Sequence, residues 1–340
     1  MFRARPVAMA AALASVALLA AACGSGGGQE DGGGPWKPDR PIEIIAPAAT
    51  GGGWDTLART SGRVLEQGGL VDEPVQVVNK PGGGGSIGWA YVAQTPDTPT
   101  RLFVTSPPIS LVPLMGGSVY DHEDFTPIAR LATEYMVYLV PDDSPIGSWG
   151  EMVDLLEEDP RQVSIAGGSS PGSMDHVGLA GAVNAAGIDP TSINYVPFDG
   201  GGEAMTQAVG GHVDAVVTGA SEAAGLVESG DLRPLAVSGA ERATTLPDTP
   251  TLQEEGVDFT FDIWRGVMGP PDMTEEQVAY YEGLFSDMTE EESWKKQTKG
   301  LGWTDSYMGS EEFGVFLDES SRDSADILTR IGLIEDGEGR

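Results

Sequence analysis

The chain has 340 residues, of which 40% are hydrophobic, enough to bury a large core and to favour two domains over one. Its 52 acidic and 19 basic residues give a formal net charge of −33. This charge argues against a nucleic-acid partner or an anionic membrane surface, because neither offers a counter-charge.

The N-terminal segment has the pattern of a cleaved export signal. Arg3 and Arg5 precede an apolar run at 6–22, which is shorter than the roughly 20 residues of a membrane-spanning helix. The run ends in small residues before Cys23, the only cysteine of the chain, so no internal disulfide is possible.

The stretch "LLAAAC" resembles the lipobox of bacterial lipoproteins, with Ala20 at a position where leucine is usual. We predict a signal peptide at 1–23 with Cys23 lipidated, followed by a flexible glycine-rich tether at 24–35. The protein is then anchored by lipid to the outer face of the cell membrane, or is periplasmic. The alternative is an ordinary signal peptide with an incidental cysteine.

From Trp36 onward, apolar β-rich runs alternate with helical segments, which predicts an α/β fold with largely parallel sheets. The expected strands are 41–47, 74–80, 101–106, 135–141, 163–167, 213–219 and 232–238, and the expected helices include 54–67, 86–94, 148–158 and 174–187. Near the end, one segment predicts a core-facing helix from the helical spacing of Phe313, Phe316, Leu317, Ile327, Leu328 and Ile331.

Four glycine-rich turns stand where a strand leads into a helix, at 50–55, 79–88, 166–176 and 196–205. Glycine lets a ligand approach the main chain, and a helix N-terminus offers unpaired N–H groups with partial positive charge. In open α/β sheets such turns lie at the carboxyl ends of strands, so several can converge on one crevice. Together they predict an anion-binding site, although glycine also serves plain tight turns.

Two enzymatic alternatives have formal matches. Gly83-x-Gly85-x-x-Gly88 fits the dinucleotide fingerprint, but the acidic residue that should end a strand some 20 residues on is missing, because Asp97 lies in a loop. Gly168-x-Ser170-x-Gly172 fits the nucleophile elbow of an exported serine hydrolase using Ser170.

The residues around Ser170 fit hydrolysis poorly. Pro171 lacks the N–H that an oxyanion hole would need, and His176 is too close in sequence for the usual triad. The histidines at 122, 176 and 212 show no metal-ligand spacing. We therefore expect no catalytic residues, no metal and no cofactor.

Five motifs in fixed order resemble the extracytoplasmic substrate-binding proteins of tripartite tricarboxylate transporters, the Bug family: "PAATGGGWDTLAR", "VVNKPGGGGSIG", "GGSSPGSMDHV", "VPFDGGGEAMTQAVGGHVDA" and "LRPLAVSGAERATTLPDTPTLQEEG". The resemblance runs from about Arg40 to the C-terminus. "VPFDGGGEA" and "WRGVMGPP" look most like the branch linked to tricarboxylates such as citrate. The family implies a non-enzymatic monomer that hands a small organic carboxylate to the large and small membrane subunits of a permease.

The resemblance implies a two-lobed Venus-flytrap fold, type II-like among periplasmic binding proteins, with the ligand cleft between the lobes. We expect one lobe from 36–138 and 264–340 and the other from 139–263. The chain would cross the hinge at 135–141 and return at 259–266.

Family members hold the ligand's carboxylates through backbone N–H groups, hydroxyls and water, without a strong arginine clamp. The resemblance implies ligand contacts from Thr50, Gly52, Gly53, Asp55, Gly83, Gly84, Ser106, Ser170, Gly172, Ser173, His176, Phe198, Asp199 and Gly200. Phe198 replaces a tyrosine of many relatives, and His176 is equally compatible with a ligand contact or a satisfied position on its helix.

Three charged residues need separate expectations: Asp55, Asp199 and Arg265. An acidic side chain repels a neighbouring anion, whereas an arginine attracts it. We expect Asp55 to cap its helix or hold a water, and Asp199 to cap the next helix or accept a ligand hydroxyl. Arg265 is expected to form an ion pair between the lobes.

Overall fold

The computed structural model describes residues 35–335, and its folded unit begins at Trp36. The predicted signal peptide, Cys23 and nearly all of the predicted tether lie outside the described residues. Between residues 35 and 335, no helix combines the length and the apolar character that crossing a membrane requires.

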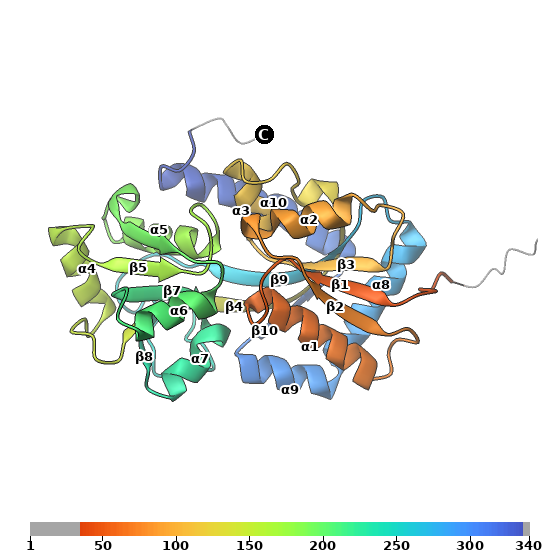
Figure 1. The fold of residues 1–340 in the computed structure, drawn as a ribbon, viewed down its shortest axis with the longest axis horizontal. Coiled ribbons are helices and arrows are strands. Elements are labelled where there is room, and N and C mark those ends of the chain that lie inside the picture. The colour runs from red at the N-terminus through yellow and green to blue at the C-terminus, as the bar shows by residue number, and fades with distance from the viewer. Residues whose placement is uncertain (1–34, 336–340) are drawn as a thin grey trace, which may run out of the picture. The chain divides into compact units, whose positions relative to one another are not determined.

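Strands and helices alternate along the described chain (Figure 1), as the apolar runs predict. The strands are β1 (Ile42–Ala46), β2 (Val75–Asn79), β3 (Arg101–Thr105), β4 (Thr126–Pro141), β5 (Ser164–Gly167), β6 (Asn194–Pro197), β7 (Ala215–Gly219), β8 (Leu232–Val237), β9 (Asp262–Gly269) and β10 (Thr304–Met308). The helices are α1 (Gly53–Gln67), α2 (Ser86–Ala93), α3 (Pro108–Leu114), α4 (Trp149–Glu158), α5 (Met174–Ala185), α6 (Gly201–Val209), α7 (Ala220–Glu228), α8 (Glu275–Glu290), α9 (Glu292–Leu301) and α10 (Ser310–Arg330), with short 3-10 turns η1 (Gly83–Gly85), η2 (His122–Asp124) and η3 (Pro190–Ser192).

Two half-sheets share the long strand β4. In the first half-sheet, β2, β1 and β3 are parallel, and β9 joins β3 to β4 in antiparallel pairing, with β10 on the other side of β4. In the second half-sheet, β7, β5 and β6 are parallel, and β7 and β8 pair with β4 in antiparallel fashion. The pairing of β4 passes from β9 to β7 and β8 between Tyr135 and Met136.

Each half-sheet is buried on both faces. Successive side chains of a strand point to opposite sides of the sheet, so neighbouring residues pack in different clusters. In β1, Ile44 packs against α1 and α8, whereas Ile45 packs with Trp89 and Phe103 on the other face. In the second half of β4, Met136 and Val137 lie in two different hydrophobic clusters. Figure 1 shows helices above and below the strands in both halves, which is a three-layer α/β arrangement.

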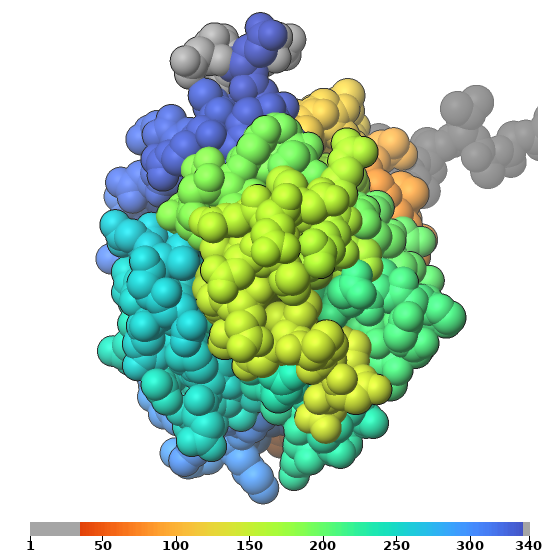
Figure 2. Space-filling view, turned by 90° about the vertical axis from the view of Figure 1, so that its left-hand side faces the viewer, coloured from red at the N-terminus to blue at the C-terminus, as the bar shows by residue number. Residues whose placement is uncertain are grey.

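Helix α10 contributes to both cores. Phe313 and Leu317, near its start, pack with Trp264 of the first half-sheet. Leu328 and the following Ile331 pack with Val177 and other residues of the second core. Figure 2 shows the blue C-terminal part of the chain lying against the green elements of the second half. The predicted boundaries assign this helix wholly to the first lobe, whereas its side chains pack in the cores of both half-sheets.

The predicted α/β class is confirmed, and the predicted strands recur, although their extent and direction differ in places. The expectation of largely parallel sheets holds for the outer three strands of each half-sheet. It is wrong around β4, where every pairing is antiparallel. The predicted strand at 135–141 is only the end of β4, which begins at Thr126. The lobe boundaries themselves stay a prediction.

Candidate functional site

A cleft of about 950 Å³ lies between the carboxyl ends of the parallel strands of the two half-sheets. The loops that follow β1, β2 and β3 form one wall, and those that follow β5, β6 and β7 form the other. Parallel strands bring their carboxyl ends to one edge, so glycine-rich turns far apart in the sequence meet here. All four glycine-rich turns contribute to the cleft.

Most of the predicted ligand residues line this cleft: Thr50, Gly52, Gly53, Gly83, Gly84, Ser106, Ser170, Ser173, Phe198, Asp199 and Gly200. Three others, Asp55, Gly172 and His176, are buried and are not among its lining residues. Whether the lining residues contact a ligand stays a prediction.

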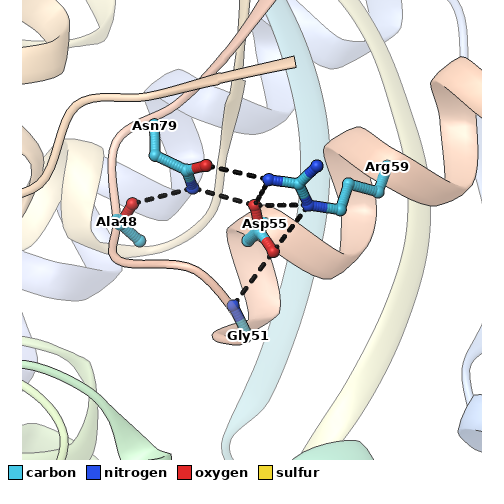
Figure 3. A network of polar contacts seen from close by, with 5 residues as sticks. All are labelled: Ala48, Gly51, Asp55, Arg59 and Asn79. Carbon is cyan, nitrogen blue, oxygen red and sulfur yellow. Dashed lines mark hydrogen bonds and ion pairs between the residues drawn. The ribbon is translucent and has the colours of Figure 1, made fainter.

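Asp55 holds the first glycine-rich loop together. Its carboxylate accepts hydrogen bonds from the Gly51 N–H at 2.9 Å, from Arg59 at 2.9 Å and from the Asn79 amide at 2.8 Å (Figure 3). Asn79 also donates to the Ala48 carbonyl, which ties the end of β2 to the loop. Burial alone would raise the pKa of Asp55, but these hydrogen bonds outweigh it and hold the pKa below its ordinary value.

The expected cap at Asp55 has a different form. Gly52 is the N-cap residue of α1, and Asp55 lies in the first turn, from where it accepts the N–H of Gly51. This bond is similar to the return bond of a capping box, in which an acidic side chain in the first turn takes a backbone N–H that precedes the helix. Asp55 therefore fixes the loop's shape from behind the wall.

The second loop runs through four consecutive glycines with positive φ, from Gly82 to Gly85, at 120°, 59°, 65° and 113°. Residues with a side chain rarely adopt this conformation, so the run "PGGGG" is a backbone requirement as well as a way to expose main chain. A Cβ added at Gly84 would lie 2.9 Å from the side chain of Val112 and 3.4 Å from Ser170 Oγ. The two walls thus approach each other closely at Gly84.

Ser106 and His176, two other predicted residues, each use one side-chain atom to accept a hydrogen bond within the protein. The Ser106 hydroxyl accepts a bond from the Trp54 indole N–H at 2.9 Å, which leaves its own proton free to donate into the cleft. On the opposite wall, His176 Nδ1 accepts the Gly172 N–H at 2.9 Å. Burial lowers the pKa of His176 to about 4, so the ring is neutral at pH 7 and braces the loop.

The expectation that Asp199 caps a helix is wrong. Helix α6 begins at Gly201, with Gly200 as its N-cap and no side-chain cap bond. Asp199 precedes the N-cap position by one residue and is a lining residue of the cleft. Acceptance of a ligand hydroxyl by Asp199 stays a prediction.

The ion pair expected for Arg265 forms, but within the first half-sheet rather than between the lobes, because both partners lie where β4 pairs with β9. Arg265 on β9 pairs with Glu134 on the neighbouring β4, and both side chains are buried. The other carboxylate oxygen of Glu134 accepts the Ser221 N–H at the start of α7. The guanidinium also lies under Gly53, where an added Cβ would be 2.6 Å from Nη1. The pair thus joins the two crossing strands to the start of α7 and the floor of the cleft.

Two acidic residues of the cleft, Asp175 and Glu222, were not predicted from the sequence. Glu222 on α7 accepts the N–H of Gly53, the first residue of α1, at 2.9 Å, so it bonds the two walls together. Asp175 lies in the first turn of α5. Each resembles an ordinary solvated acid at a helix start, and only the tertiary structure brings them to one cleft.

The charges lining the cleft favour neutral donors as the groups that bind an anion. The charged lining residues are Arg265, already paired with Glu134, and four acids: Asp175, Asp199, Glu203 and Glu222. An anionic group could therefore bind through the backbone N–H groups at the glycine loops and through hydroxyls. Among the residues that the structure describes, no unpaired guanidinium or ammonium lines the cleft.

The arrangement offers no hydrolytic relay around Ser170 in the described chain, because none of its hydrogen bonds joins Ser170 to a histidine.

Away from the cleft, three possible metal-ligand atoms lie within 4.8 Å of one another, on His122, Glu123 and Asp318. The two carboxylates are exposed, and exposed acids gather without an ion, so we assign no metal there.

Comparison with known proteins gives a consistent result. A family model described as "Tripartite tricarboxylate transporter family receptor" matches residues 63–333. A TctC solute-binding protein from Polaromonas, solved without ligand, is 27% identical, with a TM-score of 0.65 over 86% of this chain and 99% of that one. The periplasmic binding protein BugD is 23% identical, with a TM-score of 0.80 over 87% and 99%.

A further similar structure is MatC from Rhodopseudomonas palustris with bound malate, 22% identical, with a TM-score of 0.77 over 86% and 100% of the two chains. These likenesses confirm the predicted two-lobed periplasmic-binding-protein fold. The matched family and its neighbours TctC and BugD are receptors or binding proteins rather than enzymes.

Proposed function

We propose, from the premise that this chain belongs to the family of tripartite tricarboxylate transporter receptors, that it is an extracytoplasmic receptor for a small organic carboxylate. It captures the ligand and delivers it to the large and small membrane subunits of a transporter. The observation that carries the proposal is the cleft, where glycine-rich loops from both half-sheets meet and Arg265, the one cation lining it within residues 35–335, is already paired.

Ligand contacts come from the lining residues of the predicted set, while Asp55 and His176 hold two of the loops in shape. Backbone N–H groups at the starts of α5 and α6, and those of α1 other than the N–H that Gly53 donates to Glu222, supply partial positive charge. The hydroxyls of Thr50, Ser106 and Ser170 add donors. Such donors bind a carboxylate without a cationic side chain, which suits the acidic lining.

A tricarboxylate such as citrate is the favoured ligand. The motifs "VPFDGGGEA" and "WRGVMGPP" resemble the tricarboxylate branch of the family, and the similar protein MatC was solved with malate, another carboxylate. A ligand that contacts both walls favours the closed arrangement by its differential contacts, so binding drives hinge closure about the strands β4 and β9.

A thermal-shift screen over mono-, di- and tricarboxylates tests this function. We expect at least one carboxylate, with citrate first, to raise the unfolding temperature in a saturable manner. A ligand at 100 times its Kd adds about 2.7 kcal/mol to the free energy of unfolding. Matched uncharged compounds, such as the corresponding amides, should give no shift. If no carboxylate shifts the transition, the proposed function is wrong.

Lipid anchoring through Cys23 is a separate part of the proposal, based on the lipobox-like "LLAAAC". We expect Cys23→Ser to release the mature protein from the membrane fraction, since the acceptor of the lipid is removed, with its carboxylate affinity unchanged. Fractionation followed by immunoblotting measures the distribution. Ser25→Ala, two residues away, is the control and should stay with the membranes. Retention of Cys23→Ser in the membrane fraction would contradict the anchor.

A further inference from the structure

Two buried polar atoms on the second wall of the cleft have no hydrogen-bond partner among the described residues, Ser173 Oγ and Asp175 Oδ1. Ser173 is 1% exposed and Asp175 is 3% exposed, and both line the cleft at the start of α5. Buried polar groups normally have partners, because leaving one without a partner destabilises the fold. A ligand group is a natural partner for both atoms.

In the described part of the chain, the groups around Asp175 include no free cation that could balance an ionised carboxylate. Glu222 from α7 acts on it with a like charge, and the hydroxyls of Tyr138 on β4 and Tyr195 on β6 feel its charge in turn. The adjacent His176 is neutral and uses Nδ1 to accept the Gly172 N–H. The remaining charged lining residues are Asp199, Glu203 and Arg265, of which Arg265 is paired with Glu134.

The protonation state of Asp175 follows from these surroundings. Burial raises the pKa of Asp175 to about 8, and the charge of Glu222 adds to the rise, against hydrogen bonds from the Gly168 N–H and the Ser169 hydroxyl. The carboxyl of Asp175 therefore keeps its proton at pH 7. A protonated carboxyl can donate one O–H, whereas an ionised carboxylate can only accept.

We propose that Asp175 binds the ligand as a neutral carboxyl, donating its O–H to an ionised carboxylate of the ligand, with the Ser173 hydroxyl donating beside it. This inference rests on the proposed function, because it requires a carboxylate ligand. An O–H···O⁻ bond is short and strong, and its formation from a neutral donor avoids the like-charge repulsion that an ionised Asp175 would exert on the ligand.

Binding is then linked to the proton on Asp175. The negative charge of a bound ligand raises the pKa of Asp175 further, so the bound complex retains the proton at higher pH than the free protein. Below about pH 8 the proton on Asp175 leaves the affinity unchanged, because the free protein already holds it. Above that pH the affinity falls, by up to about tenfold per pH unit, because the free protein must take up a proton to bind.

Calorimetric titration with citrate between about pH 7 and about pH 9.5, where citrate itself is ionised, measures this linkage. Malate serves as the probe if citrate gives no heat. We expect the wild-type affinity to fall about tenfold or more over this range, with proton uptake seen as a dependence of the binding heat on buffer ionisation enthalpy. Asp175→Asn keeps a neutral N–H donor, so we expect affinity within about threefold of wild type at pH 7 and a flat pH profile.

Two further variants complete the design. Asp175→Leu removes the donor and should bind at least about tenfold more weakly at pH 7, corresponding to about 1.4 kcal/mol. Asp154→Asn makes the same change as Asp175→Asn at an exposed position of α4 and should keep the wild-type affinity and pH profile. Circular dichroism and the unfolding temperature of each variant confirm that it is folded before titration.

Three results would overturn the inference while leaving the proposed function intact. The first is a wild-type affinity that stays flat to pH 9.5, and the second is a fall with pH that persists in Asp175→Asn. The third is a loss of about tenfold or more in Asp175→Asn at pH 7, which would show that an ionised Asp175 accepts from a donor on the ligand. If neither citrate nor malate nor any other carboxylate binds the wild type, the proposed function fails instead.

Discussion

Arg265→Met is expected to lower the free energy of unfolding by about 3–5 kcal/mol, because it leaves Glu134 as a buried charge without its partner. The methionine fills much of the volume of the arginine stem, so the loss reports the missing charge more than a cavity. Denaturant unfolding of the ligand-free protein measures the difference.

A second substitution separates the charge from the packing. Glu134→Gln removes the charge, while its amide oxygen can still accept the Ser221 N–H that Glu134 now accepts. The double variant Arg265→Met with Glu134→Gln should therefore recover about 2 kcal/mol relative to Arg265→Met alone. Arg242→Met breaks an exposed pair with Glu254 and is the control, with an expected loss below about 1 kcal/mol. Equal losses for the two arginines would contradict the role assigned to the buried pair.

Gly53→Ala is expected to weaken carboxylate binding at least about tenfold, corresponding to about 1.4 kcal/mol. An added Cβ would lie 2.6 Å from Nη1 and 2.9 Å from Cζ of Arg265, whose guanidinium is buried and paired and so cannot easily move aside. Either the start of α1 or the Arg265–Glu134 pair must shift, and both form part of the cleft. Calorimetric titration with the best carboxylate of the thermal screen measures the loss.

The neighbouring glycine provides a matched control. Gly52 has φ −77°, and a Cβ added there would meet only the Ala49 carbonyl oxygen, at 3.8 Å. Gly52→Ala should therefore change the affinity by less than about threefold. If Gly53→Ala and Gly52→Ala bind equally well, the close approach between Gly53 and Arg265 does not shape the site.

The sequence predicts those parts of the fold that depend on the residue pattern within one short segment. The strands β1, β2 and β3 follow from short apolar runs rich in branched residues, and the converging turns follow from the parallel order of such strands. The first half of β4 was missed because Pro127, Arg130 and Thr133 interrupt its apolar pattern, although the strand is buried between two neighbours.

The residues of the candidate site likewise fall into those that a local sequence pattern predicts and those that it does not. The glycine loops are visible in the sequence because a run such as 82–85 has few other uses, and they do line the cleft. Glu222 and Asp175 were not predicted: Glu222 lies outside the motifs described above, and Asp175 lies in "GGSSPGSMDHV" but resembles an ordinary acid at a helix start. Their place in the cleft depends on contacts between distant segments, such as the bond from Gly53 to Glu222. A helix-start acid beside a glycine-rich loop, as at Asp175, is the one local signal that could have drawn attention.

The sharing of β4, β9 and α10 between the two halves also determines when the chain can fold. Strand β3 obtains its second neighbour only from β9, and both cores receive side chains from α10, close to the end of the chain. Contacts between such distant segments close long loops before they stabilise the fold, so we expect slow folding. Neither half can be completed while the C-terminal segment is still being synthesised. A nascent chain that ends before Asp262 leaves β3 as an open sheet edge. Slow folding of this kind keeps a newly made chain unfolded for longer, which would suit the extracytoplasmic location that we propose.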